Sequence, residues 1–337
     1  MARNRETARR LHELVDSLSG RKLVVVGDLI ADEFLYGRIA RVSREAPVLV
    51  LQYCNTVRLP GGAANAANNL LAIGCRVRLI GVVGPDEAGR QLVHALAGQG
   101  ADVRGVLQVP SYTTPVKTRI LAGAQHSTPQ QVVRVDRVAE IPMKLPPPVK
   151  SARIALRECE GLIISDYGYG AASPERAEEF LQFARVRSLP LVVDSRFAMS
   201  QFHGVTAITP NITELEAAAG VPIGNDAALL RKVGLRVLRR QSLGHLLVTQ
   251  GRYGMTLLRP RRKPLQIPIY GTDEVADVTG AGDTVIAVHT AVLASGGSPE
   301  EAARVANYAG GVVVMKRGTA TASREELHEA ICRDLPC

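Results

Sequence analysis

Residues 277–288, which read DVTGAGDTVIAV, place an acid on each side of a Gly-Ala-Gly step where a helix is expected to begin. Glycine in a helix costs about 1 kcal/mol relative to alanine, so a helix that only had to pack would not need two of them. The first N–H groups of a helix lack partners within the helix and carry partial positive charge. Glycine lets an anion approach these groups. Gly280, Ala281 and Gly282 therefore predict a site for a phosphate or a developing oxyanion.

Asp283 lies in the same turn and has a different chemical use. A carboxylate beside an anion site is poorly suited to bind the anion, but it can accept a proton from a hydroxyl group that attacks the anion. Phosphoryl transfer needs this combination of positioning, charge stabilisation and a late proton acceptor. We therefore expect the Asp283 carboxylate to be unburied and to face the ends of the strands. The alternative, a helix start stabilised by an acid, leaves Gly282 unexplained.

A second glycine pair opens another expected helix, in the stretch LPGGAANAANNLLAIG. Gly61 and Gly62 would bring the backbone close to a polyhydroxy ligand, and Asn65, one turn later, can donate to and accept from hydroxyl groups. Asp28 and Asp32 lie near an earlier strand end, where carboxylates can accept hydrogen bonds from neighbouring hydroxyls. The alternative for the glycines is a tight strand-to-helix turn.

Two further stretches are candidates for binding a nucleotide and its metal ion. In TPNITELE, Asn211 and Glu214 lie three residues apart and share a face of a helix's first turn. That arrangement suits Mg²⁺, which keeps several of its waters, and a plain helix cap is the alternative. The turn TQGRYG follows a strand and fits against a nucleotide, through Thr249, Gly251 and Gly254. Asn307 is a weaker candidate for contacting an adenine edge.

Several familiar motifs are absent from the sequence. It contains no GxxxxGK[ST] loop, no H-R-D loop of protein kinases and no GxGxxG. The seven histidines form no HxxxH or HExxH pattern and the five cysteines no CxxC, so neither zinc nor disulfides are expected. The odd number and wide spacing of the cysteines favour a reducing, cytoplasmic compartment.

The 337 residues have an ordinary globular composition, 46% hydrophobic and 22% charged. No apolar run reaches the about 20 residues that span a membrane, and the charged N-terminus lacks a signal-peptide core. The formal net charge is +9, but the basic residues are scattered, aromatic residues make up 4% and tryptophan is absent. We therefore expect no nucleic-acid or membrane partner, and interpret the charge as a basic rim that attracts anionic small molecules.

Short β-rich apolar runs alternate with helix-like segments, which predicts a parallel sheet buried on both faces. The runs are 22–28, 78–84, 161–168, 190–196, 206–211 and 245–251. Ligands bind beyond the carboxyl edge of such sheets, so a shared ligand site is expected where the runs end. Ordinary turn chemistry is the alternative for any single residue there. The polar residues at these ends are Asp28, Asp166, Asp194, Asn211 and Thr249.

Two segments, 29–57 and 105–135, interrupt this alternation and are typical of strands and turns without helices. We interpret them together as a small β-sheet lid over the ligand site. At the N-terminus Leu11, Leu14, Val15 and Leu18 fall on one helical face and predict a short docking helix.

With these motifs in view, the chain resembles the ribokinase-like (PfkB) sugar kinases along nearly its whole length. GGAANAANNLLAIG is similar to that family's N-terminal signature and DVTGAGD to its C-terminal one, in this order and about 215 residues apart. The finer resemblance is to the kinase domain of the heptose-7-phosphate kinases, through VVGDLIADEFLYGRIARVSREAPVLV, LPGGAAN, ITPNITELEA and DVTGAGDTVIAV.

The resemblance implies a doubly wound, mostly parallel α/β sheet with helices on both faces, a β lid that forms a homodimer contact, and use of ATP with Mg²⁺. It implies that Asp283 is the base and that Gly280 and Gly282 flank the anion site. Asn211, Ile212, Thr213 and Glu214 would line the ATP and metal region. Asp28, Gly61, Gly62 and Asn65 would hold the sugar, and Lys117 and Arg119 of the lid would meet a distal phosphate.

The sequence also departs from the heptose kinases. Tyr169 stands where they carry the lysine of Asp-Tyr-x-Lys-Gly, and Ser195-Arg196 replaces their Pro-Lys. Arg196 keeps a positive charge beside the expected nucleotide site. The lid segment AGAQHSTPQQ is longer than in these relatives. We expect residues 1–337 to form a single kinase domain with a lid, without the nucleotidyltransferase domain often fused to heptose kinases.

The functional expectation is an ATP-dependent kinase for a sugar or sugar-phosphate hydroxyl, with the anomeric hydroxyl of heptose 7-phosphate as the leading acceptor. Two alternatives stay open. One is another kinase of the same family, acting on fructose, ribose, a nucleoside or a different sugar phosphate. The other is a non-catalytic protein that senses a nucleotide or sugar.

Overall fold

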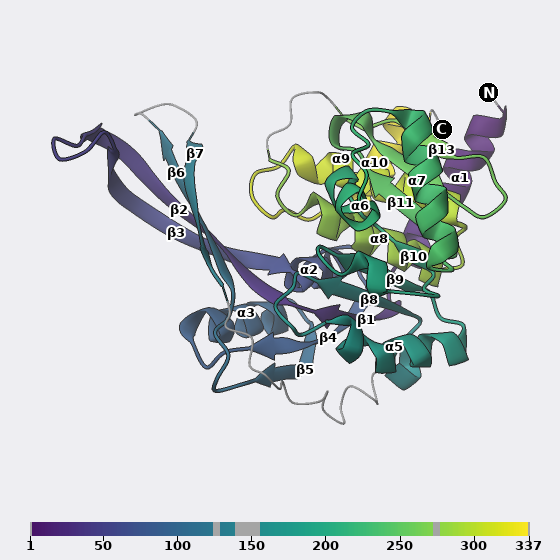
Figure 1. Ribbon diagram of the computed structural model, residues 1–337, viewed down its shortest axis with the longest axis horizontal. Helices are drawn as coiled ribbons and strands as arrows, with labels where there is room; N and C mark the ends of the chain where they lie inside the picture. The colour runs from purple at the N-terminus through teal and green to yellow at the C-terminus, as the bar shows by residue number, and fades with distance from the viewer. Residues whose placement is uncertain (1, 124–128, 139–155, 272–276, 336–337) are drawn as a thin grey trace.

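The apolar runs of the sequence form the parallel core of a nine-stranded sheet. The computed structural model describes residues 2–123, 129–138, 156–271 and 277–335, and the strand order within them is β13-β12-β11-β10-β9-β8-β1-β4-β5 (Figure 1). The strands from β11 to β5 are parallel, whereas β12 and β13 are added antiparallel. The strands are β1 (Lys22–Gly27), β4 (Arg76–Val83), β5 (Asp102–Gln108), β8 (Gly161–Asp166), β9 (Leu191–Ser195), β10 (Ala207–Ile208), β11 (His245–Thr249), β12 (Met255–Leu258) and β13 (Leu265–Ile267).

Helices cover both faces of this sheet. Because side chains alternate along a strand, Val25 packs into one hydrophobic cluster and its neighbour Val24 into the other. The first cluster is covered by α1 (Ala2–Ser17), α2 (Ala63–Ala72), α3 (Glu87–Gly98), α8 (Ala281–Ala294), α9 (Pro299–Val314) and α10 (Arg324–Asp334). The second is covered by α5 (Pro174–Arg187), α6 (Ile212–Ala219) and α7 (Ala227–Arg240). The expected doubly wound arrangement is confirmed.

A separate four-stranded sheet forms the lid, in the order β3-β2-β6-β7. Its strands are β2 (Leu29–Val42), β3 (Leu49–Gly62), β6 (Val116–Gly123) and β7 (Gln130–Arg137), and they extend from the body as a long arm (Figure 1). The lid boundaries expected from the sequence need correction. Residues 105–108 belong to β5 of the large sheet, and β3 runs on to Gly62. Half of the longer lid segment, residues 124–128, lies outside the described residues.

The two sheets meet where β1 passes into β2. Asp28 alone separates these strands, and β3 returns to the same point, where α2 begins directly after Gly62. The first residues of β2, Leu29–Ala31, are buried, whereas its far end, Arg38–Val42, is exposed. The lid is therefore anchored at the carboxyl edge of the large sheet and projects away from it.

The N-terminal segment docks as its periodicity predicts. Leu11, Leu14, Val15 and Leu18 are buried in the first hydrophobic cluster, and α1 packs beside α10. Among the helices within the described ranges, none has the length and apolar character needed to cross a membrane.

Candidate active site

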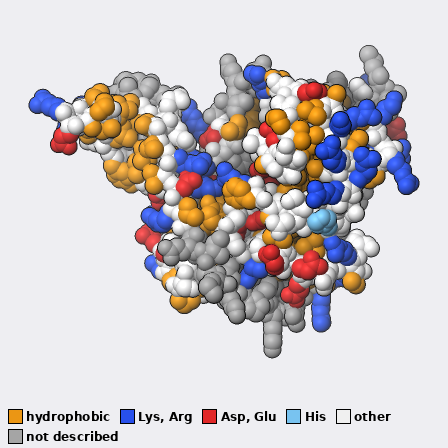
Figure 2. All heavy atoms as spheres, viewed as in Figure 1, with side chains coloured by type: hydrophobic (Ala, Val, Ile, Leu, Met, Phe, Trp, Pro, Cys, Tyr) orange, Lys and Arg blue, Asp and Glu red, His pale blue; other side chains and the backbone are white. Residues whose placement is uncertain are grey.

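The carboxyl ends of neighbouring parallel strands bring together polar residues that are far apart in the sequence. Asp28 follows β1, Asp166 ends β8, and Asp194 lies near the end of β9. Asn211 and Thr249, beyond β10 and at the end of β11, pair as an isolated parallel bridge. The surface is hollowed between the lid and the helical body (Figure 2). The shared edge expected from the sequence is present, but its residues have different roles.

Asp283 lies in the first turn of α8, and its carboxylate is enclosed. Asn65 donates from Nδ2 to Oδ2 at 2.9 Å, and the Tyr167 hydroxyl donates to Oδ1 at 2.9 Å. The residue is 3% exposed, so the expectation of an unburied carboxylate is wrong. The carboxylate nevertheless lies near the base of the lid, because Tyr167, which donates to it, also has Lys117 of the lid over its ring.

Burial raises the pKa of Asp283 to about 7. Loss of contact with water is the largest cause, and the nearby Asp32 carboxylate raises the pKa further. The hydrogen bonds from Asn65 and Tyr167 and the charge of Lys117 act in the opposite direction. A carboxyl group that titrates near neutral pH is a much better proton acceptor than an ordinary aspartate. The unexpected burial thus gives Asp283 the proton affinity of a general base.

A buried chain of polar side chains fixes Asn65. Asn69, one turn later on α2, donates from Nδ2 to the Asn65 carbonyl at 3.0 Å and to its Oδ1 at 3.1 Å. Thr284 donates from Oγ1 to Asn69 Oδ1 at 2.9 Å. Because Asn65 Oδ1 accepts from Asn69, the Nδ2 of Asn65 is the atom that faces Asp283. Sequence reasoning missed Asn69 and Thr284. The signal for Asn69 was its position four residues after Asn65, and the signal for Thr284 was its position next to Asp283.

The helices α2 and α8 both begin at a glycine. Gly62 and Gly280 are their N-caps, with φ of 57° and 79°, and no side chain of the described residues caps either helix. A Cβ on Gly280 would collide with Asn65 Nδ2, whereas a Cβ on Gly282 would meet no protein atom within 4 Å. Packing therefore requires glycine at 280 but leaves space beside 282. Ala281, between them, packs against the first hydrophobic cluster.

The other acid of the motif, Asp277, has a structural role. Its Oδ1 accepts from the Thr279 N–H at 2.9 Å, and its Oδ2 accepts from the Gly318 N–H at 3.0 Å. These bonds tie the segment before α8 to the segment after α9. Of the two acids that flank the glycines, Asp277 thus binds backbone N–H groups, whereas Asp283 binds the side chains of Asn65 and Tyr167.

Asp32 and Arg119 form a buried ion pair at the base of the lid. Arg119 Nη1 lies 2.6 Å from Asp32 Oδ1, and the two side chains are 10% and 6% exposed. A Cβ on Gly61 would collide with the Asp32 carboxylate, and one on Gly62 would lie 2.8 Å from the Asp28 carbonyl. Gly62, whose φ is 57°, is thus required by the tight turn from β3 into α2, the alternative noted from the sequence, whereas Gly61 lies against the end of the Asp32 side chain. In this arrangement Asp32 balances the charge of Arg119.

Asp28, which the resemblance implied to contact the sugar, needs correction. It is 0% exposed and accepts from the backbone N–H groups of Tyr167 at 2.8 Å, Tyr169 at 2.9 Å and Ala171 at 2.8 Å. Burial raises the pKa of Asp28 to about 6, against the opposing effect of these bonds. A carboxylate saturated in this way positions the segment after β8 rather than a ligand.

Lys117 is the second cation at the base of the lid. It is 8% exposed, and its Nζ lies 4.6 Å from the centre of the Tyr167 ring. Unlike Arg119, it makes no ion pair within the part of the chain that the structure describes. Burial lowers the pKa of Lys117, and the charges of Asp32 and Asp283 raise it.

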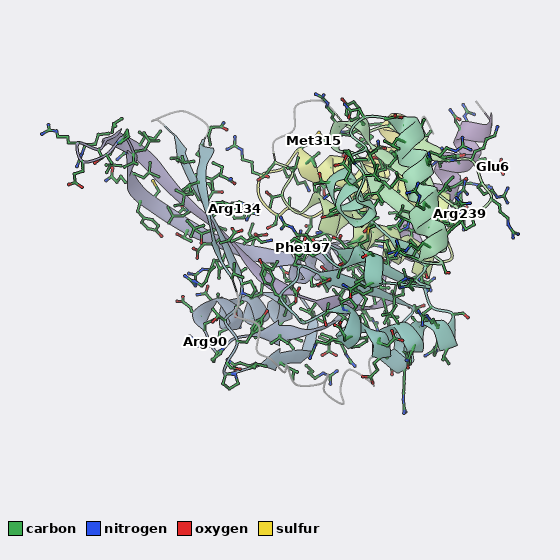
Figure 3. All side chains as sticks on the ribbon, in the orientation of Figure 1. Glu6, Arg90, Arg134, Phe197, Arg239 and Met315 are labelled. Carbon is green, nitrogen blue, oxygen red and sulfur yellow. The ribbon has the colours of Figure 1, made fainter. Side chains whose placement is uncertain are left out.

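The two departures from the heptose kinases lie close to this cluster. Tyr169 is partly buried and interacts electrostatically with Asp136, Arg196 and Arg134. Figure 3 labels Arg134 on the lid and Phe197, the neighbour of Arg196, beyond β9. Ser195 donates from Oγ to Asp166 Oδ2 at 2.7 Å, so this substitution supports the end of β8.

Asn211 and Glu214 form a complete capping box at the start of α6. This is the helix-cap alternative noted from the sequence. Asn211 Oδ1 accepts from the Glu214 N–H, and Glu214 Oε2 accepts from the Asn211 N–H, both at 2.9 Å. The charge of Glu214 acts on Asp194, and burial followed by this like charge raises the pKa of Asp194 well above its usual value. Two close carboxylates that resist ionisation suit a hard divalent cation, which would relieve their repulsion. Sequence reasoning named Asp194 only as a strand end.

The remaining nucleotide candidates are spread along the same edge. Arg196 acts on the charges of both Asp194 and Glu214. A Cβ on Gly254, where φ is 80°, would collide with the Ile267 carbonyl, so this glycine is required by the turn. Asn307 is buried and donates from Nδ2 to the Pro268 carbonyl at 2.9 Å. Thr213 and Gly251 are exposed, Thr249 is partly buried, and Ile212 packs on the second hydrophobic cluster.

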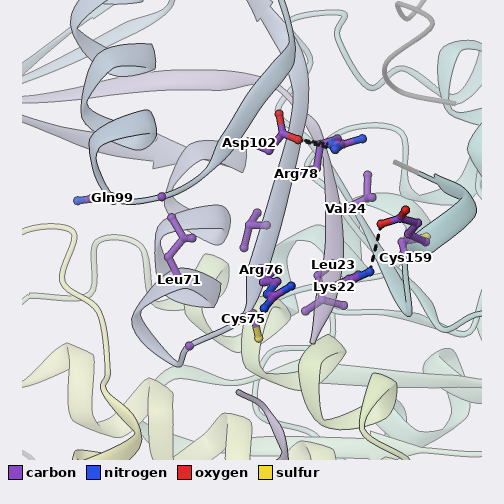
Figure 4. A pocket seen from close by; sticks show the side chains of 14 residues that line it. Lys22, Leu23, Val24, Leu71, Cys75, Arg76, Arg78, Gln99, Asp102 and Cys159 are labelled. Carbon is purple, nitrogen blue, oxygen red and sulfur yellow. Dashed lines mark hydrogen bonds and ion pairs between the residues drawn. The ribbon is translucent and has the colours of Figure 1, made fainter. Parts of the chain in front are cut away.

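A separate pocket of about 480 Å³ lies at the amino ends of β1 and β4 (Figure 4). Four of its charged groups form two ion pairs, Lys22 with Glu158 at 3.1 Å and Arg78 with Asp102. Because it lies at the opposite edge of the sheet from Asp283, it is not part of the candidate site.

The fold and the two glycine-led helix starts define a carbohydrate kinase of the ribokinase type. The chain belongs to the pfkB family of carbohydrate kinases, whose model matches residues 21–326. The bifunctional protein HldE of Geobacter sulfurreducens is 42% identical over 310 residues, which cover 90% of this chain and 61% of that protein. HldE of Klebsiella pneumoniae is 40% identical over 311 residues, 92% of this chain and 63% of the relative. The chain thus spans about three fifths of the length of these curated relatives.

Solved structures support the fold. The ribokinase of Arabidopsis thaliana, determined with ribose and ATP, matches with a TM-score of 0.75 at 19% identity, over 93% of this chain and 99% of the other. Phosphofructokinase-2 of Escherichia coli, determined with potassium, matches with a TM-score of 0.72 at 19% identity, over 93% and 99%. The expected ribokinase-like fold is confirmed.

The raised pKa of Asp283 predicts how the stability of the variant Asp283→Asn, compared with the wild type, depends on pH. An acid whose pKa rises from 3.8 to about 7 on folding contributes stability below pH 4 that is lost as the pH rises through 7. Asp283→Asn has no such loss and keeps both hydrogen bonds, because its oxygen accepts from Asn65 and its NH₂ donates to the Tyr167 hydroxyl. The variant should therefore gain about 1–4 kcal/mol over the wild type between pH 4 and pH 8. Urea unfolding across this range measures the gain, and a difference independent of pH would contradict it.

Proposed function

We propose that this chain transfers the γ-phosphoryl group of ATP to a hydroxyl group of a sugar phosphate, with heptose 7-phosphate as the leading acceptor. The observation that carries the proposal is the Asp283 carboxylate, whose pKa is about 7 and which lies one residue from the open backbone at Gly282. A proton acceptor and an uncapped helix N-terminus in one turn are the two groups that phosphoryl transfer to an alcohol needs.

Asp283 accepts the proton of the attacking hydroxyl late in the transfer. The hydroxyl oxygen forms a bond to the γ-phosphorus, the bond between that phosphorus and the bridging oxygen of ADP breaks, and the hydroxyl proton passes to the carboxylate. The N–H groups at the start of α8 stabilise the charge on the transferring group, because the helix dipole is positive at this end. Lack of a Cβ at Gly282 gives a phosphate access to them.

Asp194 and Glu214 are the residues that would hold Mg²⁺, with the remaining ligands supplied by water and phosphate oxygens. When bound, Mg²⁺ supplies charge neutralisation for the phosphates of ATP. Arg196 lies beside this pair of carboxylates and adds a positive charge for the same phosphates. The turn of Thr249 and Gly251 offers exposed backbone at the neighbouring strand end.

The acceptor would lie between Asp283 and the base of the lid. Asp32 is positioned there to accept hydrogen bonds from sugar hydroxyls, and Lys117 is the cation free to meet a distal phosphate. The resemblance to the heptose kinases and the similarity to the HldE proteins favour heptose 7-phosphate among the possible acceptors. Tyr169 replaces a lysine of the heptose kinases, and this substitution is the one that would favour a different sugar phosphate.

Replacing Asp283 by asparagine is expected to lower kcat at least about 10³-fold, because the hydroxyl then lacks its proton acceptor. The dissociation constant for ATP should stay within about two-fold, since the backbone N–H groups of α8 are unchanged. ADP release across a sugar-phosphate panel that includes heptose 7-phosphate, with ATP binding by calorimetry, measures both. Turnover equal to wild type would refute the assignment of the base. Binding of ATP by the wild type without ADP production from any sugar would favour a sensor.

Replacing Lys117 by methionine is expected to raise the KM for heptose 7-phosphate by about ten-fold or more, because a charge-assisted contact with the phosphate is lost. The KM for the same heptose without its phosphate should not change. Lys232→Met, an exposed lysine on α7, removes the same charge elsewhere and serves as the control. Equal KM values for the Lys117 variant and the control would show that the acceptor has no phosphate at this position.

The lid is expected to hold two chains together as a homodimer. Its strands β2, β3 and β7 expose apolar side chains, among them Val42, Tyr53, Val133 and Val135 at 61%, 63%, 47% and 54%. Tyr53→Ser with Val135→Ser should shift the mass in sedimentation equilibrium from twice 36.1 kDa toward 36.1 kDa. Val186→Ser, at an 86% exposed valine of α5, should leave the mass unchanged. A wild-type mass of one chain at micromolar concentration contradicts the dimer.

A further inference from the structure

Tyr167 contacts three separate parts of the site, although the sequence suggested no role for it. Its backbone N–H donates to Asp28 Oδ2 at 2.8 Å, directly after β8. Its hydroxyl donates to Asp283 Oδ1 at 2.9 Å, on α8. The Nζ of Lys117, on lid strand β6, lies 4.6 Å from the centre of its ring. Its main chain, ring and hydroxyl are therefore each held by a different element.

The two donors to Asp283 differ in what they can do after a proton arrives. The amide nitrogen of Asn65 only donates, whereas a tyrosine hydroxyl both donates and accepts. The other contacts of Asn65, to Asn69, fix which of its atoms faces Asp283. Once Asp283 holds a proton, its O–H needs an acceptor, and at 3% exposure water does not readily supply one. Rotation of the Tyr167 hydroxyl about its C–O bond supplies that acceptor without movement of the ring.

We propose that Tyr167 is a positioning residue that holds the Asp283 carboxyl group in one orientation both before and after it takes up a proton. Its hydroxyl donates to the carboxylate and accepts from the carboxylic acid. Lys117 and Asp28 hold the ring and the backbone in place while the hydroxyl reverses. The role rests on the proposed function of Asp283 as proton acceptor.

The charged groups around Asp283 come from several elements. Asp32 on β2 and Asp194 on β9 repel the ionised form, and Lys117 on β6 attracts it. The hydrogen bond from Tyr167 stabilises the carboxylate and so lowers its pKa, against burial, which raises it to about 7. Removing only the hydroxyl therefore leaves the surrounding charges in place and raises the pKa further.

The chain offers a matched pair of variants. Tyr167→Phe removes the hydroxyl and keeps the ring under Lys117. Tyr112→Phe removes a hydroxyl from a tyrosine that is 2% exposed, whose oxygen lies 3.4 Å from the Tyr169 carbonyl and makes no contact with Asp283. Any general effect of deleting a buried hydroxyl group appears in both variants.

The test uses the sugar that the wild type phosphorylates. In the pH profile of kcat, Tyr167→Phe is expected to move the acidic limb to higher pH by about one unit. At pH 7 kcat should fall about five-fold or more, because less of the Asp283 carboxyl group is ionised, with KM for the sugar within about two-fold. Tyr112→Phe should keep the wild-type limb. An unmoved limb in Tyr167→Phe, or the same shift in both variants, overturns the proposal.

A second measurement does not depend on turnover. The side-chain carboxyl ¹³C signal of Asp283, assigned by its absence in Asp283→Asn, is titrated by NMR in the wild type and both phenylalanine variants. We expect a midpoint near 7 in the wild type and about one unit higher in Tyr167→Phe only. An equal midpoint in all three proteins overturns the proposal. If no sugar is phosphorylated, the proposed function fails while this titration still decides the role of Tyr167.

Discussion

The structure depends on keeping one carboxyl group out of water without leaving it unpaired. Asp283 is 3% exposed, and an ionised carboxylate in such a place is strongly destabilising unless donors surround it. Asn65 and Tyr167 supply these donors from α2 and from the segment after β8. Asn65 in turn requires Asn69 and Thr284 to fix its amide, and it requires glycine at 280 because any Cβ there would collide with it. The buried carboxylate of Asp283 is thus linked to side chains of α2 and α8 and to the backbone conformation at Gly280.

The topology explains why these groups meet. β1 lies between β8 and β4, so the strand order reverses beside it and the connections leave on opposite faces. At this point the chain passes through Asp28 into the lid instead of into a helix. Asp28 then binds three N–H groups of the segment after β8, which carries Tyr167 to Asp283. The backbone and hydrogen bonds of Asp28 therefore link the lid and the central strands to Tyr167, and through Tyr167 to the start of α8.

Much of this could be predicted from the sequence, and the failures have a common physical cause. Continuous apolar runs identified the parallel strands, and the two glycine pairs identified the helix starts that form the site. What the sequence could not give was burial, which depends on contacts between distant segments. Asp28 was assigned to a ligand because strand-end carboxylates commonly bind one, yet it is saturated by backbone. Asp283 was expected to be open, and its enclosure by Asn65 and Tyr167 required contacts across 218 and 116 residues. Tyr167 lies in the stretch DYGYG, but its role comes from contacts with distant neighbours, which that stretch does not reveal.

The helix starts differ in whether a side chain satisfies their first N–H groups. Helices α6, α9 and α10 each begin with a complete capping box, in which side chains satisfy the first N–H groups. Helices α2 and α8 begin at glycines and have no such cap among the described residues, although a cap typically stabilises a helix by about 1 kcal/mol. Packing explains the glycine at 280, where a Cβ would collide with Asn65, but it does not explain the glycine at 282, which could carry a side chain freely. The sequence omits stabilisation where the proposed phosphate would supply it, so the unliganded helix start is less stable than its neighbours and a bound anion would complete it.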